Sequence, residues 1–267
     1  MSILEGVGLQ FEESMSGYLG VEETDPRKGA EIGKKGETPI RFSVHIIITD
    51  LSRFIKLSDQ QADLSGTVSF EPLGGNFTIR DGRFNLFTLD PETGIRQMVY
   101  AFKFTALDGK TYFLHGHKEI HDDRGQFDVI EDMTRLFTTI YRGEDDQAPV
   151  YGAGELYFKL SDAPSMMASM KVVGAASIWQ EVAAYTAFSS FACGALRDEY
   201  LKDVRDVIVI ELSYSAQFYK YLKTFLRLPE NTFVFKRSGG KNLTVAEVEE
   251  RVAKVQEMGK MRREVLV

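Results

Sequence analysis

The stretch from Met98 to Ile120, MVYAFKFTALDGKTYFLHGHKEI, decides the fold class. Apolar side chains alternate with other residues in its first half, and Asp108-Gly109 interrupts the pattern before a second run, 111–120. A period of two places one set of side chains on a single face of a β-strand. Because Asp-Gly favours a tight turn between strands, the stretch predicts an antiparallel hairpin. The apolar residues that share the first strand's face are Met98, Tyr100, Phe102 and Phe104.

Segments of the same design lie on both sides of this hairpin, separated at short intervals by turn-forming residues. The most specific local prediction is a two-residue hairpin loop at Asp81-Gly82, between strands 76–80 and 83–89. About nine strands with local connections favour an up-and-down antiparallel meander, either a barrel or a curved two-faced sheet. The further predicted strands are 9–19, 40–48, 64–71, 127–130, 134–141 and 150–160.

The last third of the chain is predicted to be mainly helical. Residues 177–200 are rich in small side chains and predict a long helix, and Thr244 to Glu247 has the spacing of a capping box that opens another. Segments 207–212 and 233–236 predict two short strands between these helices. No alternation of strands and helices of the kind that builds a doubly wound parallel sheet is visible.

The expected fold class is therefore α+β and mainly β. We expect an antiparallel β domain over residues 1–165 and a mainly helical extension over 166–267 that packs on it. Residues 20–38 are charged and contain glycines, which predicts a mobile loop, with a lid over a barrel mouth as the alternative.

The composition argues against several classes of protein. Hydrophobic residues make up 43% of the chain, which is typical of a packed protein, and a net charge of -7 without a basic stripe argues against nucleic-acid binding. The single cysteine, Cys193, and the absence of a signal-peptide pattern at the start favour a reducing cytoplasm. Segment 172–196 is long enough to cross a bilayer, but its polar residues and glycines favour a buried or partner-facing helix instead.

One cluster of residues could carry chemistry. The stretch 115–123 contains His115, His117, Asp122 and Asp123, whereas nucleotide-binding and hydrolase motifs are absent. On a strand, the two histidines would share a face about 7 Å apart, a separation that two metal ligands can span. His121, Asp122 or Asp123 could approach from the following turn, but nothing in the sequence shows that such a third ligand converges, so we predict no metal and no other cofactor. The same cluster in acid–base catalysis is the enzyme alternative.

Scattered blocks of the chain form an ordered pattern: 9–19, 66–75 and 82–87, then Gly116, Lys118, Asp122 and Asp123, then Phe188, Phe191, Gly194, Leu196, Asp198 and Tyr200. This pattern resembles an accessory region of bacterial cholesterol-oxidase-like glucose-methanol-choline flavin oxidoreductases and covers about residues 7–203. The chain lacks a flavin-binding glycine fingerprint, so flavin catalysis is not implied. The resemblance implies an accessory module that handles sterols or other lipids, or that docks beside an oxidoreductase.

These observations favour a non-catalytic binding module for an apolar small molecule of the lipid or sterol class, or an accessory partner of an oxidoreductase. An alternative is that the aromatic residues simply fill the core and the chain is a homo-oligomeric interaction protein, associating through its helical third. The enzyme that uses 115–123 is the remaining alternative, and no catalytic residue can be assigned. The candidate ligand-binding residues are Tyr100, Phe102, Phe104, His115, His117, Lys118, Asp122 and Asp123.

Overall fold

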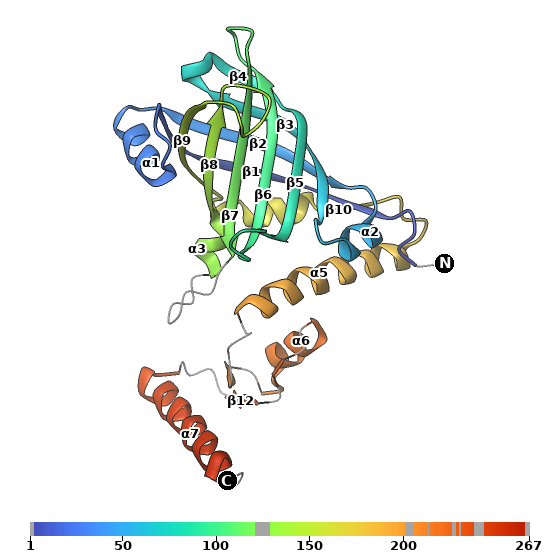
Figure 1. Ribbon diagram of the computed structural model, residues 1–267. Helices are drawn as coiled ribbons and strands as arrows, with labels where there is room; N and C mark the ends of the chain where they lie inside the picture. Colours follow the sequence, from blue (N-terminus) through green and yellow to red (C-terminus); the bar gives the residue numbers. More distant parts are fainter. Residues whose placement is uncertain are drawn as a thin grey trace. The chain divides into compact units, whose positions relative to one another are not determined.

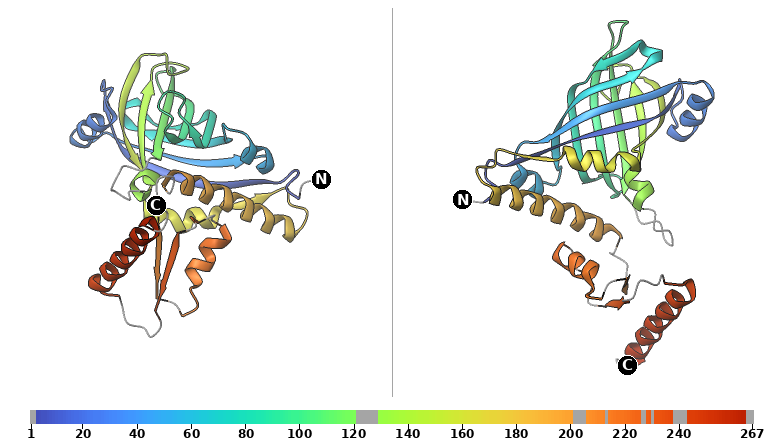
Figure 2. Two further views of the ribbon diagram at one scale, coloured as in Figure 1. Left: turned by 60° about the horizontal axis from the view of Figure 1, so that its bottom comes forward. Right: turned by 180° about the vertical axis from the view of Figure 1, so that it is seen from behind.

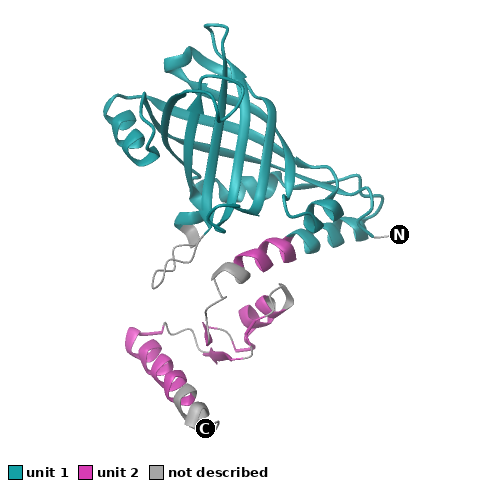
Figure 3. Cartoon of the chain, in the orientation of Figure 1, with its two compact units in different colours: residues 1–188 teal, residues 189–267 magenta. Residues whose placement is uncertain are grey.

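The computed structural model describes residues 3–120, 129–200, 206–212, 214–225, 228–229, 231–237 and 243–264 (Figure 1). The chain divides into two compact units, Met1–Phe188 and Ser189–Val267 (Figure 3). Unit 1 therefore includes residues 166–188, which the sequence assigned to the C-terminal extension. The reason is that β10 (Lys171–Val173) pairs with the first strand of the barrel.

Unit 1 is built around a closed antiparallel barrel of eight strands, which confirms the mainly β prediction. The strand order is β1-β2-β3-β5-β6-β7-β8-β9, and β9 pairs back onto β1. Two further strands extend this sheet: β4 (Gly75–Thr78) pairs with β3, and β10 pairs with β1. The eight barrel strands are β1 (Gly8–Val21), β2 (Pro39–Ile48), β3 (Gln61–Phe70), β5 (Arg80–Leu89), β6 (Arg96–Thr105), β7 (Thr111–Ile120), β8 (Arg135–Tyr141) and β9 (Val150–Tyr157).

Helices connect these strands and follow them. Within unit 1 they are α1 (Pro26–Lys35), α2 (Leu51–Lys56), η1 (Glu71–Leu73), α3 (Val129–Thr134), η2 (Leu160–Asp162) and α4 (Ala163–Ser169). The long helix α5 (Ile178–Tyr200) contains the division between the two units and confirms the predicted helix at 177–200. No helix among the described residues is both long and apolar enough to span a membrane.

The barrel interior is filled with aromatic rings that touch one another. The rings of Phe84 and Tyr100 lie 4.9 Å apart between centroids, and those of Phe42 and Phe102 lie 5.6 Å apart. Near the β6–β7 turn, Phe104 stacks on Tyr112 at 5.8 Å. Such contacts are typical of a close-packed core rather than of an open lumen.

The predicted hairpin loop at Asp81-Gly82 is wrong. These residues lie inside β5, because β4 and β5 do not pair with each other; both pair with β3, one after the other along its length. Thr67 pairs with Thr78 and Leu64 pairs with Gly82, so one extra residue is inserted between the two pairings. Asp81 has φ +50°, which Asp-Gly tolerates in a β-bulge as readily as in a hairpin turn.

The predicted loop over residues 20–38 is also wrong in its central part. Helix α1 occupies Pro26–Lys35, and the Asp25 side chain caps it by accepting hydrogen bonds from the backbone N–H groups of Arg27 and Lys28. An aspartate before a proline is the pattern of a helix start, and it was the signal available in the sequence. Likewise, the predicted strand 127–130 is wrong where the structure describes it, because Val129 and Ile130 begin α3.

Unit 2 contains β11 (Val207–Glu211), α6 (Gln217–Phe225), β12 (Thr232–Lys236) and α7 (Val245–Glu264). The two strands predicted here are confirmed, but they pair in parallel and α6 joins them, so a small strand–helix–strand unit was missed. The buried side chain of Glu211 accepts hydrogen bonds from the backbone N–H groups of Phe218 and Tyr219 and thereby caps α6.

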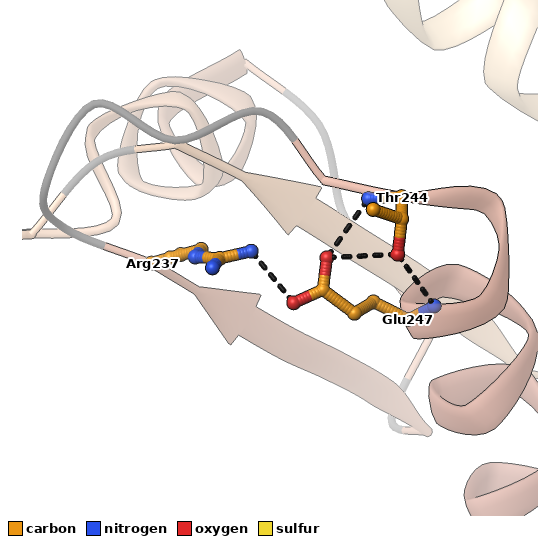
Figure 4. Close-up of polar contacts among 3 residues, drawn as sticks. All are labelled: Arg237, Thr244 and Glu247. Carbon is orange, nitrogen blue, oxygen red and sulfur yellow. Dashed lines mark hydrogen bonds and ion pairs between the residues drawn. The ribbon is translucent and has the colours of Figure 1, made fainter.

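The predicted capping box is confirmed at the start of α7 (Figure 4). The backbone N–H of Thr244 donates to the Glu247 carboxylate at 2.8 Å, and the N–H of Glu247 donates to the Thr244 hydroxyl at 3.3 Å. Arg237, directly after β12, donates to the other carboxylate oxygen at 2.7 Å. The hydrogen bonds from Thr244 lower the pKa of Glu247, with a smaller contribution from Arg237.

Candidate functional site

The residues predicted to bind a ligand do not form one site. Strand alternation places Tyr100, Phe102 and Phe104 on the inner face of the barrel, where each is at most 1% exposed. Lys118 also lies inside and is 2% exposed, whereas His115 and His117 belong to the opposite, outward face of β7. Asp122 and Asp123 lie outside the described residues.

A buried polar group crosses the barrel interior. The ammonium group of Lys118 lies 3.0 Å from one carboxylate oxygen of Glu13, and the Tyr100 hydroxyl donates to the other at 2.6 Å. The lysine nitrogen also lies over the ring of Tyr100, 5.3 Å from its centroid. Burial raises the pKa of Tyr100 well above its ordinary value, and the Glu13 carboxylate raises it further. Each charge in this interior group is therefore balanced by a partner.

Sequence reasoning did not single out Glu13. Its position carried a signal, because Phe11 and Met15 occupy the same face of β1 on either side of it. A glutamate at an inward position of an apolar strand face needs a buried cation or donor. Lys118 occupies an inward position on β7, which is not adjacent to β1 in the sheet, so only the closed barrel brings the two side chains together.

The two histidines form part of a row of rings on the outer barrel wall. Centroid distances are 6.5 Å from Phe113 to His115, 6.1 Å from His115 to His117, and 5.6 Å from His117 to Phe137. Burial lowers the pKa of both histidines, and Glu119 opposes this shift at His117. Among the described residues, no group of three or more His, Cys, Asp or Glu side chains could hold a metal ion.

A large open groove lies on the outer wall beside α1. We call it the α1 groove, and it encloses about 1010 Å³. Two glycines let the helix lie directly on the strands: a Cβ at Gly29 would come within 1.9 Å of the Ala153 carbonyl oxygen, and one at Gly33 within 2.7 Å of the Leu19 backbone. The lining residues are Ser16, Gly17, Tyr18, Arg27, Ala30, Glu31, Lys34, Pro39, Ile40, Arg41, Ser69, Glu71, Arg135, Glu155, Tyr157 and Lys159. Figure 2 shows α1 against the barrel wall from two further sides.

The strand register creates the floor of the α1 groove. Ser16 on β1 pairs with Arg41 on β2 on one side and with Tyr157 on β9 on the other. The row continues from Tyr157 to Arg135 on β8, and from Arg41 to Ser69 on β3. Residues that are paired across antiparallel strands share a face. The row therefore runs across five strands on the outer wall.

The α1 groove is cationic although the chain is acidic. Five of its lining residues are basic and three are acidic, against a net charge of -7 for the whole chain. Arg135 pairs with Glu131 at 2.8 Å. The other four cations form no ion pair with any acid in the part of the chain that the structure describes; they are Arg27, Lys34, Arg41 and Lys159.

Two arginines of the α1 groove stack on one ring. The guanidinium carbons of Arg27 and Arg135 lie 5.4 Å and 5.1 Å from the centroid of Phe137. This outward ring, contributed by β8, is only 8% exposed because these side chains and His117 cover it. The cation–π contacts hold two positive charges at the edge of the groove.

Two tyrosines supply apolar surface in the α1 groove. Tyr18 is 37% exposed and Tyr157 is 41% exposed, and they lie on the neighbouring strands β1 and β9. The Tyr157 hydroxyl donates to the Glu155 carboxylate at 2.8 Å. Burial and this hydrogen bond raise the pKa of Tyr157 to about 12, so the hydroxyl stays protonated at neutral pH.

Comparison with protein-family models, curated proteins and solved structures finds no match for this chain. The resemblance to an oxidoreductase accessory region therefore stays a prediction. Sequence reasoning missed the α1 groove, because its residues come from α1 and several separate strands that only the closed barrel brings together. Its lining offers hydrogen-bond donors, positive charge and aromatic faces, which are the elements of a binding site.

Proposed function

We propose that unit 1 is a non-catalytic binding module for a small molecule with an apolar body, of the lipid or sterol class, and that this ligand binds in the α1 groove. The observation that carries the proposal is the contrast between a barrel interior filled with touching rings and an open groove of about 1010 Å³ with two half-exposed tyrosines. Ligand sites commonly enclose between about 300 and 1000 Å³.

The distribution of the titratable groups supports binding rather than catalysis. Inside the barrel, the Glu13 carboxylate is buried, and each of its oxygens already accepts a hydrogen bond, one from Lys118 and one from Tyr100. In the α1 groove, the carboxylate of Glu155 accepts a hydrogen bond from the Tyr157 hydroxyl. The resemblance to an accessory region supports the same proposal and extends it to a role beside an oxidoreductase.

Native mass spectrometry of the purified chain tests this function, followed by thermal unfolding in the presence of oleate and of cholesterol. A ligand that binds only the folded state raises the unfolding midpoint. We expect a bound adduct or a raised midpoint with at least one of the two compounds. Absence of an adduct together with an unchanged midpoint for both compounds would refute the proposed function.

Self-association is a second candidate function, and a specific surface favours it. The first turns of α5 expose the chain's single tryptophan, Trp179, to 74%, together with Ile178 and Val182. An exposed apolar cluster is typical of an interaction surface. We expect a dimeric mass by light scattering, which Trp179→Gln reduces to that of a monomer. Leu89→Gln, at an exposed apolar position on β5, is the control, and a monomeric mass for the unmodified chain would rule this candidate out.

A further inference from the structure

We infer that the α1 groove recognises an amphiphile by its anionic head group, which Arg41 and Arg135 bind above Ser16 and Tyr157. The inference rests on the proposed function, because it specifies the chemistry of the ligand that binds there. It goes further by assigning the recognition to named cations and by fixing the sign of the ligand's charge.

The α1 groove carries an excess of positive charge that no acid pairs in the part of the chain that the structure describes. Lys34 and Arg41 are both exposed in the α1 groove and have no ion pair among the described residues. The guanidinium of Arg27, stacked on Phe137, is a further charge without an ion pair among the described residues, whereas Arg135 on the same ring is paired with Glu131. A guanidinium has five N–H donors, so this one contact leaves donors of Arg135 for a ligand. Like charges in one hollow surface repel one another and raise the local concentration of anions. A bound anion relieves this repulsion.

The row of paired residues across the strands sets the distance between Arg41 and Arg135. Arg41 and Arg135 lie on β2 and β8, and β1 and β9 separate these strands. Three strand spacings of about 4.8 Å put their backbones about 14 Å apart along the wall. Ser16 and Tyr157 lie between them, and long arginine side chains can reach toward this midpoint from both ends. Arginine is suited to a carboxylate or phosphate because its donors form a planar fork.

The α1 groove also offers apolar surface to the body of the ligand. The half-exposed rings of Tyr18 and Tyr157, with Pro39 paired opposite Tyr18, offer apolar surface next to the arginine row. Removing apolar area from water contributes about 25 cal/mol per Å². A ligand with both parts therefore gains from the rings and from the cations, whereas an inorganic anion gains only from the cations.

The three acids of the α1 groove set the limits of this site. Glu155 accepts a hydrogen bond from the Tyr157 hydroxyl, and Glu31 and Glu71 are exposed at the groove surface. Because Glu31 lies on the same helix stripe as Arg27 and Lys34, its charge opposes a bound anion. A second, independent prediction follows: removal of the Glu31 charge strengthens the binding of an anionic ligand.

The experiment compares three probes with the same hydrocarbon chain, each below its aggregation concentration, by titration calorimetry on the full chain. We expect affinity to fall in the order oleate, oleyl alcohol, oleylamine, and added salt to weaken oleate binding because it screens exposed charges. Inorganic phosphate is the arm without an apolar body, and we expect it to bind far more weakly than oleate.

Variants locate the charge recognition. We expect Arg41→Gln to weaken oleate binding about tenfold, the effect of losing one charge-assisted contact, and to leave oleyl alcohol binding unchanged. Glu31→Gln should strengthen oleate binding. Arg83→Gln is the matched control, because Arg83 is an exposed strand arginine on β5 outside the groove, and it should have no effect.

The outcomes separate the inference from the proposed function. Equal binding of oleate and oleyl alcohol, with no effect of Arg41→Gln, would overturn the inference and leave the apolar binding function standing. Phosphate binding as tight as that of oleate would overturn the role of the apolar body. If none of the amphiphiles binds, the proposed function itself fails and the inference fails with it.

Discussion

Charged residues are paired on the inner face of the barrel wall, whereas several on the outer face beside α1 are unpaired within the described part of the chain. On the inner face, Lys118 and Tyr100 both contact Glu13, and every member of the group has a partner within 3.0 Å. On the outer face beside α1, Arg41 and Lys34 have no acidic partner among the described residues. The comparison teaches that a buried charge with its partner present stabilises the fold, whereas exposed like charges without partners are available to a ligand.

The largest effect should come from removal of the interior carboxylate. Glu13→Ala leaves Lys118 buried without its counter-charge, and we expect a loss of about 3–5 kcal/mol in the free energy of unfolding. Urea unfolding, followed by circular dichroism, measures it. Glu12→Ala is the matched control, because Glu12 is the adjacent residue on β1 and is exposed. Equal effects of the two variants would contradict the structural role of the interior group.

A second test changes the outer wall and leaves the interior intact. Gly29→Val places side-chain atoms where the Ala153 carbonyl already lies, so α1 must shift away from the strands. We expect the overpacking to lower the free energy of unfolding by about 1–3 kcal/mol and to abolish oleate binding. Gly36→Ala, at the end of α1, is the control because a Cβ there has room, at 3.4 Å from the nearest atom. Retained binding in Gly29→Val would show that α1 does not form the site.

A pair of tyrosine variants compares the two faces directly. Tyr100 and Tyr157 each donate a hydrogen bond to a glutamate, one inside the barrel and one in the α1 groove. We expect Tyr100→Phe to cost about 1–3 kcal/mol of stability, because it leaves a buried carboxylate oxygen without that donor. Tyr157→Phe should leave stability unchanged, since water can replace the lost partner. The reverse order of effects in chemical denaturation would break the comparison.

The smallest effect concerns pH and the outer histidines. Burial lowers the pKa of His115 and His117 in the folded chain, so the unfolded chain takes up protons more readily. The stability that these neutral histidines contribute is present above their ordinary pKa of about 6.5 and is lost as pH falls below it. We expect the double variant His115→Gln, His117→Gln to lose less stability than the unmodified chain between pH 7 and pH 5, as measured by urea unfolding at each pH. An identical pH dependence would contradict the shift.

The sequence predicted the antiparallel meander, with a barrel as one of its two forms, because the signals for strands and turns are local. Alternating residues such as Tyr100, Phe102 and Phe104 follow from strand geometry, and Asp108-Gly109 follows from turn geometry. The Asp81-Gly82 bulge could not be separated from a hairpin, because both need the same backbone freedom. The difference between them lies in the pairing with β3, which is a property of the assembled sheet.

The candidate site could not be predicted from local sequence patterns. Arg41, Ser16 and Tyr157 become neighbours only because β1 pairs with both β2 and β9 when the barrel closes. Helix α1 escaped prediction since Gly29 and Gly33, which resemble loop residues in a sequence, serve as a flat packing face. The buried residues of this helix are these two glycines and not the large apolar side chains by which surface helices are commonly recognised.

The central claim is that the ligand binds on the outer face of the wall and not inside the barrel. The most direct measurement is a nuclear magnetic resonance titration of the full chain, carrying isotope-labelled tyrosine, with oleate. Single Tyr→Phe variants assign the signals. We predict that the ring signals of Tyr18 and Tyr157 shift as oleate is added and stop shifting once the site is filled. The ring signals of Tyr100 and Tyr112 should stay in place. Shifts at Tyr100 and Tyr112 with none at Tyr18 and Tyr157 would place the ligand in the interior and contradict the account.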